Sequence, residues 1–174
     1  MENTIRILLC ESFEYQKKYG VSNACIAVSI IADKVLKMLD IPSKIVYGHI
    51  PGKYPVNHVW VQSNDLVIDF AYFEDLSIQI TKPTTPDTFY TELISREEGI
   101  LTDNYFQGDE ETQSLGIPMG HHQEFVNAKN HPDITLRKCL KFDHLKNYYH
   151  DMLKLGLYIL KDPNSIATLS LKWE

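Results

Sequence analysis

The spacing of apolar residues changes at Pro42, and this change constrains the fold more than any other feature. Up to Leu39, apolar residues recur every three or four positions, which is the period of a helix. After Pro42 come short runs rich in β-branched and aromatic residues, namely Lys44–Ile50, Val56–Gln62 and Leu66–Tyr72. Such runs favour strands. The chain is therefore predicted to be an α+β protein, with helices packed on a small antiparallel sheet.

Two helices are expected before Pro42. The first covers Glu2–Tyr19 and ends at Gly20, a residue type that commonly closes helices. The second is expected to be capped by Ser22 or Asn23 and to run to about Leu39. Because its first half is apolar nearly all round, we interpret it as a buried central helix.

The second half of the chain is less regular. A short helix from Asp87 or Thr88 to about Arg96 and a long surface loop over Gly99–Gly120 are expected. Asp143–Leu160 is predicted to form a helix with a break at Gly156. The irregular middle of the chain is too short to separate two cores, so we predict one domain over 1–174, with a core at about 20–75 and a C-terminal elaboration at about 76–174.

Composition excludes several classes of protein. The net charge of −6 disfavours binding to nucleic acid or anionic membranes, which requires a positive surface. No apolar run approaches the ~18 residues that span a bilayer, and the N-terminus lacks the features of a secretory signal. Three cysteines without a Cys-x-x-Cys motif indicate neither a disulfide framework nor structural zinc. We therefore expect a cytoplasmic protein.

Cys25 lies at the expected start of the second helix. There the helix dipole and free backbone N–H groups favour a thiolate and can bind a developing oxyanion. A cysteine on a buried helix is more often a small hydrophobic side chain, so Cys25 alone does not indicate catalysis.

His58 and Asp69 strengthen the case for Cys25. If Asn64-Asp65 form a two-residue turn, Trp60 lies opposite Asp69 and His58 opposite Ala71. His58 and Asp69 are then diagonal neighbours on one face of the sheet, within reach of a hydrogen bond. An aspartate in an otherwise apolar strand is costly unless it has a partner. We therefore predict a Cys-His-Asp triad for acyl transfer or amide hydrolysis through a thioester.

These residues resemble the transglutaminase-like core, which belongs to the wider papain-like group of thiol enzymes. The resemblance covers about 22–72: Cys25 at a helix start, the passage Asp40-Ile41-Pro42-Ser43-Lys44-Ile45-Val46-Tyr47-Gly48, then His58-Val59-Trp60 and Val67-Ile68-Asp69. It implies a nucleophile at Cys25, a general base and acid at His58 and an orienting carboxylate at Asp69. The tryptophan that often accompanies the family's cysteine is absent here.

The expected reaction needs no cofactor and no metal. The substrate is expected to be an amide in a peptide, a protein or a small molecule, with hydrolysis favoured over transfer to an amine. Candidates for an oxyanion contact are Tyr19, Asn23 and Gln16, beside the backbone N–H of Cys25, and Trp60 is a further candidate for a substrate contact. Trp60 is expected to be a core residue that shields the His58–Asp69 pair from water.

Two other functions stay open. One is a non-catalytic binding module on a transglutaminase-like scaffold. The other is an enzyme similar to arylamine acetyltransferases, although their Arg-Gly-Gly approach to the cysteine is replaced here by Gly20-Val21-Ser22-Asn23. A metal site built from histidines is disfavoured because their spacing matches no strong ligand signature; these histidines are His121, His122, His131, His144 and His150. His121 or His122 reaching the active site from a loop is a second reading, and solvated or structural histidines are the favoured one.

Overall fold

A computed structural model describes residues 1–21, 24–50, 56–64, 66–71, 106–107, 119–166 and 169. The helix expected to start at Asp87 or Thr88 and most of the loop expected over Gly99–Gly120 lie outside the described residues. The elements in chain order are α1 (Glu2–Tyr19), α2 (Cys25–Met38), β1 (Lys44–Ile50), β2 (Val56–Ser63), β3 (Leu66–Ile68), β4 (Phe106–Gln107), α5 (Met119–Asn130), α6 (Pro132–Cys139) and α7 (Asp143–Lys161). This is the predicted α+β class.

Helix α1 ends as its sequence predicts. Gly20 adopts a left-handed conformation with φ of 65°, which costs glycine no steric strain. The N–H of Val21 then donates to the carbonyl of Gln16 at 2.8 Å, so carbonyls at the helix end find partners. The chain is thereby turned out of α1 shortly before Cys25.

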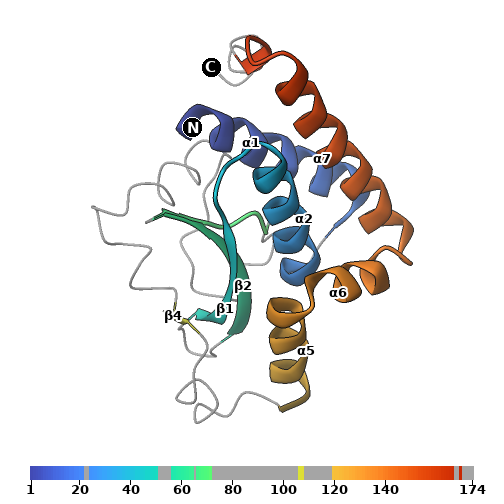
Figure 1. Ribbon diagram of the computed structural model, residues 1–174. Coiled ribbons are helices and arrows are strands. Elements are labelled where there is room, and N and C mark those ends of the chain that lie inside the picture. Colours follow the sequence, from blue (N-terminus) through green and yellow to red (C-terminus); the bar gives the residue numbers. More distant parts are fainter. Residues whose placement is uncertain are drawn as a thin grey trace.

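Helix α2 lies at the centre of the molecule, between the strands and α7 (Figure 1). Nearly all of its side chains from Ala27 to Leu36 are buried, which confirms the prediction of a buried central helix. The helix stops where Asp40 takes up a φ of 56°, a conformation that aspartate tolerates better than most residues. Its N-cap is Ala24, so the predicted cap at Ser22 or Asn23 is wrong.

The strands form one antiparallel sheet in the order β3-β2-β1-β4. The pairing of β2 with β3 follows the predicted register, with Ser63 opposite Leu66 and Val61 opposite Ile68. Asn64 in the turn has a φ of 52°, as expected for a tight hairpin. Strand β3 ends at Ile68, earlier than predicted, so Asp69 lies just beyond it.

Each of the C-terminal helices contacts α2, and α5 also contacts β1 and β2. Helix α7 contacts both α1 and α2 and runs without a break through Gly156, so the predicted break is wrong. A Cβ on Gly156 would lie 2.3 Å from Cε of Met38 and 3.0 Å from Cγ1 of Val35. The glycine therefore allows α7 to approach α2 closely.

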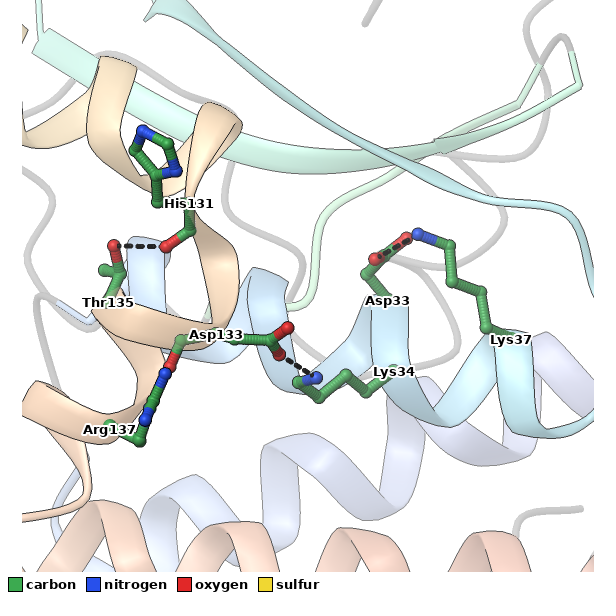
Figure 2. A network of polar contacts seen from close by, with 7 residues as sticks. All are labelled: Asp33, Lys34, Lys37, His131, Asp133, Thr135 and Arg137. Carbon is green, nitrogen blue, oxygen red and sulfur yellow. Dashed lines mark hydrogen bonds and ion pairs between the residues drawn. The ribbon is translucent and has the colours of Figure 1, made fainter.

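Helices α5 and α6 were not predicted, and Met119 and Gly120 begin α5 rather than end a loop. Pro132 separates the two helices because it suits the first turn of a new helix. Figure 2 shows how α6 is joined to α2: Nζ of Lys34 lies 2.5 Å from Oδ1 of Asp133.

Among the described residues, no helix has the length and apolar character needed to cross a bilayer.

Candidate active site

Cys25 is the first residue of α2. Helix geometry leaves the first N–H groups without an acceptor inside the helix, and the N-cap residue, Ala24, has no side chain that could accept from them. The first hydrogen bond of the helix runs from the N–H of Val28 to the carbonyl of Ala24 at 2.9 Å. The N–H groups around Cys25 are therefore suited to an anion. Cys25 itself is partly exposed, whereas Cys10 is fully buried.

His58 and Asp69 form the buried pair that the hairpin register predicts. Nε2 of His58 lies 2.6 Å from Oδ2 of Asp69, and the two side chains are 1% and 0% exposed. The other carboxylate oxygen, Oδ1, accepts from the N–H of Ala71 at 2.9 Å. This bond to the residue two positions on competes with strand pairing and explains why β3 ends before Asp69. Both oxygens of the buried carboxylate are thus satisfied.

The Cys25 thiol acts on the same imidazole. Burial by itself lowers the pKa of His58, but the charge and hydrogen bond of Asp69 and smaller contributions from Cys25 outweigh burial and raise this pKa from 6.5 to about 10. Because Asp69 occupies Nε2, Nδ1 is the nitrogen through which the ring can exchange a proton with the thiol. The structure therefore pairs His58 with Asp69 and places Cys25 at the start of α2, where its thiol is close enough to act on the imidazole.

Trp60 lies on the same strand as His58 and is 2% exposed. The two rings are stacked, with centroids 6.3 Å apart and planes inclined by 20°. An apolar ring in this position excludes water from one face of the imidazole, which strengthens the electrostatic contact with Asp69. Trp60 is thus a core residue placed where it can shield the pair.

The three oxyanion candidates have different positions. Asn23 lies outside the described residues. The hydroxyl of Tyr19 donates to Asp151 of α7, so it serves the contact between α1 and α7. The amide nitrogen of Gln16 donates to the carbonyl of Phe70 at 2.6 Å and to Oγ of Ser12 at 3.0 Å. Both of its protons are committed, which leaves the backbone N–H groups at the start of α2 as the donors the geometry favours.

Sequence reasoning missed two polar contacts around the site. Oγ of Ser29, one turn after Cys25 on α2, donates to the carbonyl of Val59 at 2.9 Å and so joins the nucleophile helix to the strand of His58. Ser12 and Gln16 are buried on α1. The available signal was spacing: polar residues four positions apart share one face of a helix, and Ser29 follows Cys25, as Gln16 follows Ser12, at that distance.

Cys139 and the histidines considered as metal ligands belong to the C-terminal helices or to the residue that caps α6. Cys139 on α6 is half-buried, and burial raises the pKa of its thiol. His121 and His122 belong to α5 rather than to a loop. His131, at the start of α6, and His144 and His150 of α7 are exposed. Within the part of the chain that the structure describes, no group of three or more His, Cys, Asp or Glu side chains is placed to hold a metal ion.

Comparison of the chain with protein-family models, with curated proteins and with solved structures found no match. The function must therefore be argued from the geometry of the Cys25–His58–Asp69 site itself.

Proposed function

We propose that this chain is a thiol-dependent enzyme that forms an acyl-enzyme at Cys25, with amide hydrolysis favoured over transfer to an amine. One observation supports this most: the buried imidazole of His58 is held by Asp69 at 2.6 Å and interacts with the Cys25 thiol. A purely structural His–Asp pair needs no thiol beside it. The resemblance to the transglutaminase-like core, with its papain-like arrangement, supports the same assignment.

The first half of the reaction forms the thioester. His58 accepts the proton of the Cys25 thiol, and the sulfur attacks the carbonyl carbon of the amide. The negative charge that develops on the carbonyl oxygen faces the N–H groups at the start of α2, which stabilise it. As the C–N bond breaks, the imidazolium of His58 gives its proton to the departing amine.

The second half releases the acyl group. Having given its proton to the amine, His58 accepts a proton from water, whose oxygen attacks the thioester carbonyl. The C–S bond then breaks, and His58 returns the proton to the sulfur, which yields a carboxylic acid and the free thiol. Asp69 orients the ring and stabilises the imidazolium in both halves. An amine in place of water would yield a new amide. Hydrolysis is favoured because water needs no second binding site.

Acylation by p-nitrophenyl acetate tests this proposal without knowledge of the substrate. We expect a burst of p-nitrophenolate and an acetyl group on the peptide that contains Cys25, found by mass spectrometry after an acid quench. Cys25→Ala and His58→Ala should lose the burst, whereas Cys139→Ala, a matched removal of a partly exposed thiol, should keep it. A burst that survives in Cys25→Ala would refute the proposal.

A further inference from the structure

The carboxylate of Asp69 accepts a hydrogen bond from a backbone peptide group, and a side chain of helix α1 in turn donates a hydrogen bond to that peptide group. The N–H of Ala71 donates to Oδ1 of Asp69 at 2.9 Å. The carbonyl oxygen of the same planar peptide group, that of Phe70, accepts from Nε2 of Gln16 at 2.6 Å. Because a peptide group is rigid, a side chain that fixes its oxygen also fixes the direction of its N–H. Gln16 thus controls the donor that orients the carboxylate beside His58.

The hydrogen bonds from Gln16 to Asp69 point in one direction, and the bond from His58 meets them at the carboxylate. Gln16 donates to the peptide oxygen, the peptide N–H donates to Asp69, and the other oxygen of Asp69 accepts from His58. A donor at the oxygen of a peptide polarises the group and makes its N–H a stronger donor. The side chains of Gln16, Asp69 and His58 are all buried, so water does not weaken these contacts.

Gln16 is anchored in turn by a contact between α1 and α7. Its amide donates to Oγ of Ser12 at 3.0 Å, and this hydroxyl lies 2.6 Å from the hydroxyl of Tyr148 on α7. Ser12 and Tyr148 are fully buried. Helices α1 and α7 thus meet at a polar contact. Gln16 extends this contact to the peptide group between Phe70 and Ala71.

We propose that Gln16 is a positioning residue for the triad, and that Ser12 and Tyr148 support it by fixing its amide between α1 and α7. The inference rests on the proposed function, because it assigns these residues to orienting a carboxylate that serves catalysis. It also gives the C-terminal helix α7, which lies outside the resemblance to known thiol enzymes, a part in building the site.

Gln16→Met tests the proposal because methionine keeps the length of the side chain and removes both donors. Ser63→Ala is the matched control: it also removes a side-chain hydrogen bond to a backbone carbonyl, that of Pro42 at 2.6 Å, at the far end of β2. The readout is the titration of the His58 imidazole by NMR in the full chain. Asp69 and Cys25 are the titratable groups that act on it.

We expect Gln16→Met to lower the pKa of His58 by roughly one unit, because a looser carboxylate supports the imidazolium less well. Ser63→Ala should leave this titration unchanged even if it lowers stability equally. Equal titrations in the two variants would overturn the proposal. If Gln16→Met does not fold, Ser12→Ala carries the same test with a smaller shift in the same direction, and its absence overturns the proposal equally.

The same proteins separate this inference from the proposed function. If the wild-type protein shows no acylation at Cys25 but Gln16→Met still shifts the titration of His58, the enzyme assignment fails and the positioning stands. If Cys25 is acylated in a manner that depends on His58 while Gln16→Met behaves as Ser63→Ala does, the positioning fails and the enzyme assignment stands.

Discussion

His58 and Asp69 face each other with 2.6 Å between Nε2 and Oδ2, and both side chains are buried. A buried ion pair is expensive to assemble and costly to break, because either partner alone is an uncompensated charge. The chain keeps such a pair next to a thiol at a helix start.

Removing the charge of Asp69 should lower the pKa of the His58 imidazole. In Asp69→Asn the carboxylate that raises the pKa of His58 is lost and burial remains, so this pKa should fall to 6.5 or below. NMR titration of His58 measures the change. Asp33→Asn is the matched control, since Asp33 is a buried carboxylate of α2 that contacts Ser43 and Lys37 instead. A similar fall of the His58 pKa in both variants would contradict the assignment of the raised pKa to Asp69.

The stability of the protein should decrease in alkaline solution because of His58. The pKa of His58 is raised from 6.5 to about 10 in the folded chain, so the folded state binds the proton more tightly than the unfolded state does. The resulting stabilisation is complete below about pH 6.5 and is lost as the pH rises toward 10, with a slope of at most about 1.4 kcal/mol per pH unit. Urea unfolding across this range should show a flatter dependence for His58→Gln; equal slopes would exclude the effect.

A side chain at Gly156 should push α7 away from α2. The nearest atoms to a Cβ there are Cε of Met38 at 2.3 Å and Cγ1 of Val35 at 3.0 Å. Met38 can swing its terminal methyl aside, whereas Val35 is stiffer, so we expect Gly156→Val to lower the free energy of unfolding by about 1–3 kcal/mol. Leu157→Val places the same residue type at the next position, where the side chain is exposed, and should change it by less than about 0.5 kcal/mol. If the two variants lost equal stability, helix propensity rather than the contact with α2 would account for the loss.

Ser29→Ala should weaken the attachment of α2 to β2. The variant leaves the buried carbonyl of Val59 without the donor that the Ser29 hydroxyl supplies at 2.9 Å, which costs about 1–3 kcal/mol. Ser165→Ala is the comparison, because the buried hydroxyl of Ser165 has no hydrogen-bond partner within the described part of the chain. Its removal should be neutral or stabilising. Thermal unfolding of the two variants measures both effects. An unfolding temperature of Ser29→Ala that is no lower than that of Ser165→Ala would contradict the prediction.

Local rules were sufficient to predict the hairpin and the pair that it brings together. Asn64 tolerates positive φ, which sets the register of β2 with β3 and so places Asp69 near His58. The N-cap of α2 could not be found in this way. Ser22 and Asn23 are better caps than Ala24, yet the helix begins at Cys25, where a residue without a side-chain acceptor leaves the first N–H groups available.

Contacts between distant segments account for what the sequence did not reveal. Gly156 suggested a break because glycine weakens an isolated helix, but the close approach of α2 favours it there. Tyr148 is a residue of α7, and only the fold shows its hydroxyl beside Ser12 of α1. Nothing in either local sequence signals a contact between residues so far apart along the chain.

Alkylation by iodoacetamide tests the central claim, that His58 activates Cys25, most directly. Peptide mass spectrometry of the wild-type protein at about pH 6–7 should show Cys25 modified far faster than Cys10 or Cys139, since reactivity follows the thiolate. In a folded His58→Ala variant, modification of Cys25 should slow by about tenfold or more, because the imidazole that accepts the thiol proton is gone. Slow and equal reaction at all three cysteines, or a rate at Cys25 that His58→Ala does not change, would contradict the account.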